Sequence, residues 1–322
     1  MQSDPMIHGV DVAKDELVVQ HLGQTAFHRL RNRAGEIRSW LRQLPKGSIV
    51  AMESTGEYHQ LLARLAHAAG MRVFVLNARR VYLYARALEV RGKTDRVDAG
   101  VIARYVAEHG HKLHEWQPPC ALHRRIDELF RRRAVLVAKR ESLRQSMRGC
   151  KDVQAEFKKL DRAVDSLVRF MDRKINELIK ADDTMRTSRD LIETVIGFGP
   201  QGSALLAVLL ERLPFACSDS LVAYSGWDPR PADSGRKHGR RKLSKCGASY
   251  IRKQWFMVGF SAAHAKALKP MYQAMLARGL ASTEACVILG RKLLRAAFAV
   301  WKTKRPFDLA KFLGGPQAHA EL

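Results

Sequence analysis

Residues 121–181 contain no proline and, in Gly149, a single glycine. Leu, Arg, Lys and Glu are frequent in this stretch, and all four favour helix. Apolar residues recur at helical spacing in both halves, as Leu122, Ile126, Leu129 and Phe130 and then as Leu160, Val164, Leu167, Val168 and Met171. The pattern predicts two long helices folded into a helical hairpin or coiled-coil arm. A simple spacer or dimer strut is the plainer function for such an arm.

Short apolar segments precede this arm and alternate with helical patterns. We expect strands at Ile7–Val12 and at residues 17–21, 48–52 and 71–76, and helices at residues 58–69 and 97–108. Strands mixed with helices of 10–15 residues indicate an α/β layer fold. The sequence therefore predicts an α/β domain over residues 1–118, the arm over residues 119–190 and a mainly helical domain over residues 191–322.

The charge is strongly positive. The chain has 322 residues and a formal net charge of +24, with 56 Lys and Arg against 32 Asp and Glu. Such a charge suggests a polyanionic partner, with nucleic acid first and an anionic membrane surface second. The longest apolar run, residues 204–210, is far shorter than the roughly 20 residues that span a bilayer, so no membrane partner is expected. The five widely spaced cysteines indicate neither a disulfide framework nor a zinc site, and a cytoplasmic setting is expected.

Acidic residues stand at the ends of the predicted strands. Asp11 lies near the end of the first strand and Glu53 ends the third, while Asp95 and Asp98 lie three apart at the start of a helix. Buried carboxylates are costly unless they are compensated, and Mg²⁺ ions, which prefer oxygen ligands, would compensate these four. A pair of such ions can stabilise both the attacking and the leaving oxygens in phosphodiester cleavage. Taken alone, Asp95 and Asp98 are as readily explained as a helix cap and a first-turn acid.

Three segments resemble one known family. They are His8-Gly9-Val10-Asp11-Val12-Ala13-Lys14, Glu53-Ser54-Thr55-Gly56 and Lys93-Thr94-Asp95-Arg96-Val97-Asp98-Ala99. They are similar to the signature of the DEDD insertion-sequence transposases, a family that includes the Piv-type pilin-gene DNA invertases. The resemblance implies a RuvC-like, ribonuclease H fold for residues 1–118, with Asp11, Glu53, Asp95 and Asp98 as catalytic, Mg²⁺-binding residues. His8 is a small departure, since the family usually has an aliphatic residue there.

The last domain begins with a glycine-containing turn between two helical patterns. Gly197 and Gly199 interrupt residues 191–213 in the manner of a helix-hairpin-helix. Such glycines let the backbone approach a DNA phosphate at the start of the next helix. An ordinary helical turn that needs glycine for a positive φ explains them equally well.

A basic loop follows, and it contains a serine. Ser234 and Gly235 stand in a proline-containing irregular segment, just before six Lys or Arg in residues 236–245. Composition alone makes Ser234 an ordinary turn serine. The resemblance implies that it attacks DNA and forms a covalent phosphoserine link. Ser244 is its nearest rival, with phosphate contact or helix capping as its expected role. The residues expected to bind nucleic acid are Gly197, Gly199, Arg236, Lys237, Arg240, Arg241, Lys242, Lys245, Arg252 and Lys253.

The resemblance implies a DNA recombinase that exchanges strands through a Holliday-junction-like intermediate. The serine and the acids would come from different protomers of a homodimer or homotetramer, with donor and target DNA as partners. The insertion-sequence branch of the family uses a bridge RNA to pair with both DNAs, and the excess charge fits binding of both RNA and DNA. The alternatives are a protein-only site-specific invertase, a metal-dependent junction nuclease and a non-catalytic nucleic-acid-binding protein. We expect the protein in the bacterial cytoplasm, associated with the nucleoid.

Overall fold

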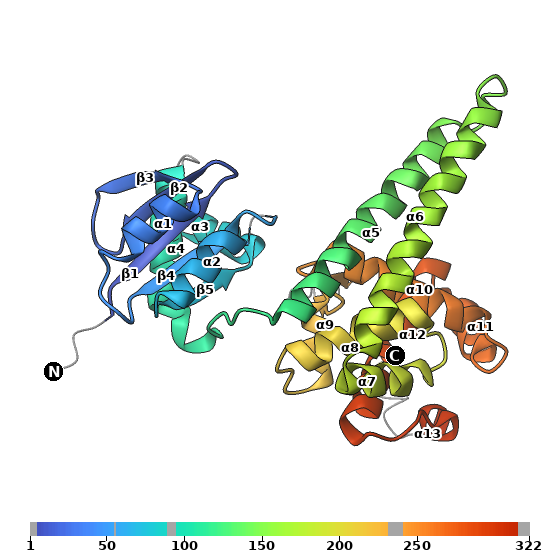
Figure 1. Ribbon diagram of the computed structural model, residues 1–322. Helices are drawn as coiled ribbons and strands as arrows, with labels where there is room; N and C mark the ends of the chain where they lie inside the picture. Colours follow the sequence, from blue (N-terminus) through green and yellow to red (C-terminus); the bar gives the residue numbers. More distant parts are fainter. Residues whose placement is uncertain (1–4, 55, 89–94, 231–240, 315–322) are drawn as a thin grey trace. The chain divides into compact units, whose positions relative to one another are not determined.

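The computed structural model describes residues 5–54, 56–88, 95–230 and 241–314, with side chains in the range 95–97 left out (Figure 1). Predictions that fall on the other residues, Ser234 among them, lie outside this description. The chain divides into two compact units, Met1–Pro118 and Pro119–Leu322.

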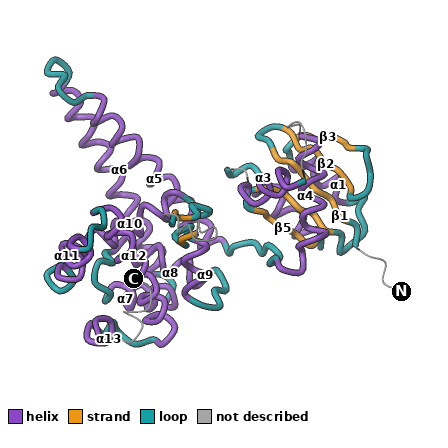
Figure 2. Tube along the Cα trace, turned by 180° about the vertical axis from the view of Figure 1, so that it is seen from behind, coloured by secondary structure: helices purple, strands orange, loops and turns teal. Residues whose placement is uncertain are grey.

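The first unit is built on a five-stranded mixed sheet with helices on both faces (Figure 2). Its elements are β1 (Ile7–Val12), β2 (Glu16–His21), β3 (Phe27–Arg31), α1 (Ala34–Leu41), β4 (Ile49–Glu53), α2 (His59–Ala68), β5 (Arg72–Leu76), α3 (Ala78–Ala87), α4 (Asp95–His109) and the short 3₁₀ helix η1 (Gly110–Lys112). The strand order is β3-β2-β1-β4-β5. The first three strands pair antiparallel, and β1, β4 and β5 pair parallel. This mixed α/β arrangement fits the ribonuclease H-like domain that the sequence predicts.

Two apolar clusters lie on opposite faces of this sheet because side chains alternate along a strand. Val10 and Met52 face α1 and α2 in one cluster. Ile49 and Ala51 face α3 and α4 in the other. The sequence predicted β1, β2, β4, β5, α2 and α4, whereas it missed β3, α1 and α3. In β3 only Leu30 is buried, so the strand lacks the alternation that marks its neighbours.

The second unit is helical apart from one short ribbon. Its helices are α5 (Ala121–Ser146), α6 (Gln154–Lys180), α7 (Asp183–Glu193), α8 (Pro200–Arg212), α9 (Ser218–Tyr224), α10 (Ser249–His264), α11 (Lys269–Ala277), α12 (Ser282–Thr303) and α13 (Leu309–Gly314), and its strands are β6 (Pro229–Arg230) and β7 (Lys242–Leu243). Trp255 is fully buried at the centre of its core. Helices α10 and α12 cross closely at Gly259, where a Cβ would lie 2.1 Å from the Cys286 carbonyl oxygen.

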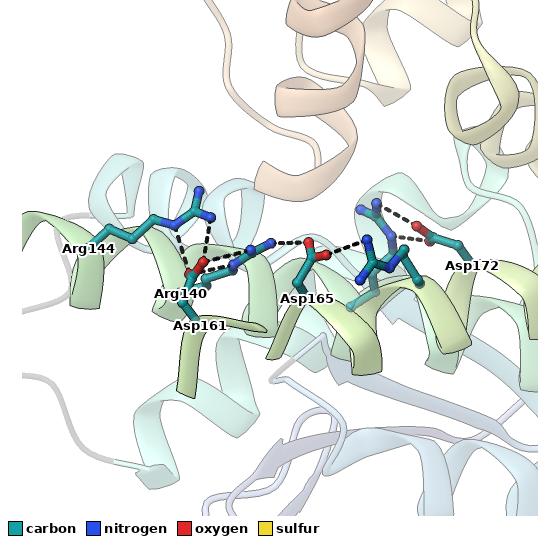
Figure 3. A network of polar contacts seen from close by, with 7 residues as sticks. Arg140, Arg144, Asp161, Asp165 and Asp172 are labelled. Carbon is teal, nitrogen blue, oxygen red and sulfur yellow. Dashed lines mark hydrogen bonds and ion pairs between the residues drawn. The ribbon is translucent and has the colours of Figure 1, made fainter. Parts of the chain in front are cut away.

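Helices α5 and α6 form the predicted helical hairpin (Figure 1). Near its base Ile126, Phe130, Ile175 and Ile179 are buried. Farther along the helices the seam is ionic, because Arg140 and Arg144 both bind Asp161 and Arg140 also binds Asp165 (Figure 3). Leu160 and Leu167, expected in the apolar interface, are 50% and 49% exposed. The other members of the predicted stripe do face inward, since Val168 and Met171 are buried and Val164 is half-buried. The prediction is therefore wrong for Leu160 and Leu167 alone, and coiled-coil packing stays a prediction.

Candidate functional site

Two of the predicted carboxylates lie on neighbouring parallel strands. Asp11 is the fifth residue of β1, and Glu53 ends β4. Val10 pairs with Met52, so Asp11 and Glu53 occupy the next matched positions along the two strands. Ala51, two residues before Glu53, belongs to the cluster beneath α3 and α4. By the same alternation, both acids lie on the α4 side of the sheet.

Helix α4 brings a third acid, Asp98, towards the ends of β1 and β4. We call the part of the sheet that carries Asp11 and Glu53, together with the start of α4, the acidic edge. A Cβ on Gly9 would lie 2.0 Å from the Ala99 carbonyl oxygen, so only glycine lets α4 approach β1 this closely. Asp98 immediately precedes Ala99, while Asp11 follows Gly9 by two residues on the same face. Asp95 opens α4 one turn earlier. Gly9 was given no role from the sequence, although a glycine inside a strand is the usual signal of close backbone approach.

The chemistry of these donors suits a hard divalent cation. Carboxylate oxygens are the ligands that Mg²⁺ prefers, and Asp11, Glu53 and Asp98 are all partly exposed to solvent. Among the described side chains, no group of three or more His, Cys, Asp or Glu lies close enough to hold a metal ion. That set of side chains does not include Asp95. The donor set therefore fits Mg²⁺ by its chemistry, and the complete tetrad stays a prediction.

In the second unit, a short ribbon supports the two ends of the basic loop. Strands β6 and β7 pair antiparallel, with Pro229 opposite Leu243 and Arg230 opposite Lys242. Ser234, Arg236, Lys237 and Arg240 lie outside the described residues, between these strands. The ribbon thus fixes where the loop leaves and re-enters the unit.

Side chains and backbone groups lock the base of this ribbon. The Ser244 amide donates to the Asp228 carbonyl oxygen over 3.0 Å, and the Lys245 amide donates to that of Gly226 over 3.0 Å. The Arg252 guanidinium donates to the carbonyl oxygens of Lys245 and Gly247. Arg252 was predicted to contact nucleic acid, whereas these bonds give it a structural part. No sequence signal predicts these bonds, because Lys245 and Gly247 lie before α10, outside the helix that carries Arg252.

Ser244, the rival nucleophile, is a buried structural residue. It is 1% exposed, and its hydroxyl donates to the Asp228 carboxylate. Helix α10 has Ala248 as its N-cap, without a side-chain capping bond. Ser244 therefore neither caps α10 nor presents its hydroxyl to a phosphate in solution. Both expected roles for Ser244 are wrong, because burial and the bond to Asp228 occupy the side chain.

The two glycines of the α7–α8 turn have different surroundings. Gly197 has a φ of +95°, and its Cβ would lie 2.6 Å from the Val258 carbonyl oxygen of α10. Positive φ and close packing therefore explain this glycine within the fold itself. Gly199, the N-cap of α8, is exposed, and a Cβ on it would meet nothing within 4 Å among the described residues. If the turn meets a phosphate, Gly199 and the start of α8 are the accessible part.

The remaining cations predicted to bind nucleic acid lie on the surface. Arg241, Lys242, Lys245 and Lys253 are all exposed. Lys245 adopts a φ of +55° at the end of the ribbon, which is uncommon for a residue other than glycine. Arg241 immediately precedes β7, Lys242 lies on it and Lys245 follows it by two residues, where the basic loop returns, whereas Lys253 lies on α10. Within the described part of the chain, no helix has the length and apolar character needed to cross a membrane.

Two family profiles match this chain. One is a transposase profile of the DEDD type found in IS110, which matches residues 8–152 and therefore the acidic edge and much of the hairpin. The other is the transposase profile of the IS116/IS110/IS902 family, which matches residues 189–273 and therefore the ribbon and its support. The first match continues through α5 of the hairpin, the second begins within α7, and together they span more than half of the chain.

Curated relatives match over nearly the whole length. The pilin gene-inverting protein of Moraxella lacunata is 26% identical over 319 residues, which is 93% of this chain and 97% of the relative. That of Moraxella bovis is 25% identical with the same coverage. An uncharacterised 44.8 kDa protein of insertion element IS116 from Streptomyces clavuligerus is 26% identical over 46% of this chain and 37% of its own length.

Proposed function

Because this chain belongs to the IS116/IS110/IS902 family of transposases, we propose that it is a DNA recombinase in which the acidic edge and Ser234 share one reaction. The observation that carries the proposal is the placement of Asp11 and Glu53. They stand at matched positions on neighbouring parallel strands, next to the segment of α4 that holds Asp98. Three carboxylates at one edge of a sheet, on a chain of net charge +24, suit a metal-dependent reaction on phosphate.

Asp11, Glu53, Asp95 and Asp98 would hold one or two Mg²⁺ ions. Bound there, the metal would neutralise charge on the phosphate and favour cleavage of its ester bond. Without that neutralisation, the carboxylates would repel the DNA backbone. The acidic edge can therefore bind DNA favourably only when cations lie between the carboxylates and the phosphates.

Ser234 would act as the nucleophile. Its hydroxyl oxygen forms a bond to the scissile phosphorus and loses its proton, while the bond from phosphorus to the leaving deoxyribose oxygen breaks and that oxygen takes a proton. The scissile phosphate thereby stays a diester, with Ser234 in place of the leaving deoxyribose oxygen. Attack by the hydroxyl group of a second strand can reverse the step. Arg241, Lys242 and Lys245, exposed at the return of the loop, would bind the adjoining phosphates.

Adduct trapping tests this proposal. End-labelled DNA carrying the element's ends is incubated with the full chain and Mg²⁺, and then denatured. We expect a labelled protein–DNA adduct from the unaltered chain, and none from Ser234→Ala, from Asp11→Asn or after chelation. DNA binding by both variants is the control for folding. An adduct formed by Ser234→Ala would refute the serine mechanism, and adduct formation by Asp11→Asn would refute the part given to the acidic edge.

A composite site in a homodimer or homotetramer makes a separate prediction. If one protomer supplies the acids and another the serine, a mixture of Asp11→Asn and Ser234→Ala chains contains complete sites. The mixture should then form adducts that neither variant forms alone. Persistent inactivity of the mixture, with both variants bound to DNA, would place all the residues of a site in one protomer.

We also propose that a bridge RNA chooses the donor and target DNA. Support comes from the family and from the amount of positive charge, of which half of the excess lies in residues 191–322. Copurification of a discrete RNA, and loss of site choice after ribonuclease treatment, would support it. Unchanged site choice without RNA would contradict it.

Protein-only site-specific inversion is the second candidate. It is favoured by the match to pilin gene-inverting proteins over 93% of this chain. A plasmid with two sites in inverted orientation distinguishes the reactions, because inversion keeps the plasmid intact while transposition moves a segment to new DNA.

A further inference from the structure

An open groove lies between α1 and α2, on the face of the sheet opposite the acidic edge. Its volume is about 510 Å³, which is within the usual range for small-ligand sites. Leu44, Leu65 and Met71 contribute to its floor and Arg38, Arg42 and Lys46 to its rim. The floor belongs to the apolar cluster that joins α1 and α2 to the sheet. Nothing in the proposed recombination chemistry uses this groove.

The rim cations are exposed, and none of them is paired within the described part of the chain. Arg38 lies in the last turn of α1, Arg42 is its C-cap, and Lys46 follows one turn later. None of the described residues that line the groove is acidic. The nearby acid of α1, Glu36, accepts a bond from the Arg31 amide over 2.7 Å and is thereby held away. Three like charges at this spacing repel one another, and an anion between them would relieve the repulsion.

We propose that this groove binds single-stranded nucleic acid, with phosphates on Arg38, Arg42 and Lys46 and a base on the apolar floor. Arg38 and Arg42 lie at the C-terminal end of α1, where the exposed carbonyl groups of the helix attract positive charge. This attraction stabilises the two cations although none of the described acidic residues pairs with them. The three rim cations are complementary to a polyanion, and this complementarity indicates the class of ligand. The proposal rests on the proposed function only in taking nucleic acid as the natural anion of this chain.

The apolar floor favours a single strand over a duplex. In a duplex the bases are stacked inside, and only sugars and phosphates would meet Leu44, Leu65 and Met71. A single strand can lay an unpaired base on an apolar surface while its phosphates reach the rim. The sulfur of Met71 adds a favourable contact with an aromatic base, although this side chain is only 6% exposed.

The groove is separate from the catalytic edge within the same unit. It is formed by α1 and α2, whereas Asp11, Glu53 and Asp98 lie on the side of α3 and α4. The sheet stands between them. One strand could therefore be held on the groove while another DNA segment meets the acids.

Photocrosslinking of the full chain tests the placement directly. An oligoribonucleotide containing 4-thiouridine is bound, irradiated and mapped by mass spectrometry. We expect crosslinks in the peptides that carry residues 65–71, and their loss in the triple variant Arg38→Gln/Arg42→Gln/Lys46→Gln. The triple variant Lys266→Gln/Lys269→Gln/Arg278→Gln removes equal charge from exposed positions of the other unit and should keep them. Crosslinks that survive the rim variant, or that vanish equally in the control, overturn the proposal.

Binding measurements distinguish nucleic acid from other anions. Because three cations no longer meet phosphates in the rim variant, the slope of log affinity against log salt should fall by about 2. Poly-glutamate of matched charge should fail to displace the oligonucleotide, and equal displacement would assign the groove to an acidic peptide instead. Asp11→Asn should keep the crosslinks while losing adduct formation, so this inference and the proposed function can fail independently.

Discussion

At the level of single residues, His8 is unusual because it is a buried histidine among other histidines. It is 5% exposed, and its ring lies 5.1 Å from that of His21 and 5.8 Å from that of Trp40. Burial, followed by the nearby His21 and His28, lowers the pKa of His8 to about 4. Neither ring nitrogen of His8 has a hydrogen-bond partner among the described residues. The protonated form is therefore disfavoured in the folded state.

The low pKa of His8 should make the folded protein less stable in mild acid. Between pH about 6.5 and about 4, the unfolded chain binds a proton at His8 while the folded chain does not, so the free energy of unfolding decreases as the pH falls. The expected loss is about 1.4 kcal/mol for each pH unit over which only the unfolded chain is protonated. In urea unfolding, His8→Val should show a smaller loss over this range. An identical pH dependence in the variant would contradict the assignment.

Ser244 gives the second prediction at this scale. Ser244→Ala removes the bond to Asp228 at the base of the β6–β7 ribbon, and we expect a loss of about 1–2 kcal/mol in the free energy of unfolding. Adduct formation should persist at temperatures where the variant stays folded, because the residue is structural. Loss of adducts with an unchanged melting temperature would instead return Ser244 to the reaction.

Among the elements, the hairpin of α5 and α6 depends on a shared carboxylate. Asp161 accepts two bonds from Arg140, at 2.8 and 3.0 Å, and two from Arg144, both at 2.8 Å (Figure 3). These bonds, and the two charges, hold the pKa of Asp161 well below its usual range. The stabilisation is therefore present above the pKa of the unfolded carboxyl group and is lost only as the pH falls through the lower folded value.

Asp161→Asn should loosen the outer part of the hairpin alone. Amide hydrogen exchange is expected to speed up around residues 140–165 and to stay slow near Ile126 and Ile175, which are fully buried at the base. The control is Lys159→Gln, which removes an ion pair whose side chains are 71% and 73% exposed and should change little. Uniform acceleration along both helices would show that Asp161 supports the whole hairpin.

The same helices show how far sequence reasoning reaches. Helical spacing was enough to predict the hairpin, because α5 and α6 are long and free of proline. It could not identify the inner face, since Leu160 and Leu167 repeat as regularly as the buried Ile175 does. The ion pairs that decide the outer seam join residues about 20 positions apart, beyond any local pattern. The positions of Asp11 and Glu53 on neighbouring strands could be predicted because apolar strand patterns and acidic residues are both visible in the sequence. The bond between Ser244 and Asp228 could not be predicted, because it joins residues 16 positions apart.

At the scale of the whole molecule, the acidic edge lies entirely within one compact unit. Asp11, Glu53, Asp95 and Asp98 all precede the boundary at Pro118, and the apolar clusters on both faces of the sheet are complete without residues beyond it. A unit of this length with its own core is in the normal size range for independent folding. Ser234 belongs to the other unit.

Residues 1–118 should therefore fold alone and bind a divalent cation without the rest of the chain. A ligand that binds only the folded state raises the melting temperature as its concentration increases. We expect Mg²⁺ or Mn²⁺ to stabilise the isolated unit in calorimetry, and Asp11→Asn to abolish the effect. Adduct formation should be absent from this fragment because it lacks Ser234. A folded fragment whose melting temperature is the same with and without the metal would show that the four acids need DNA, or another protomer, to complete the site.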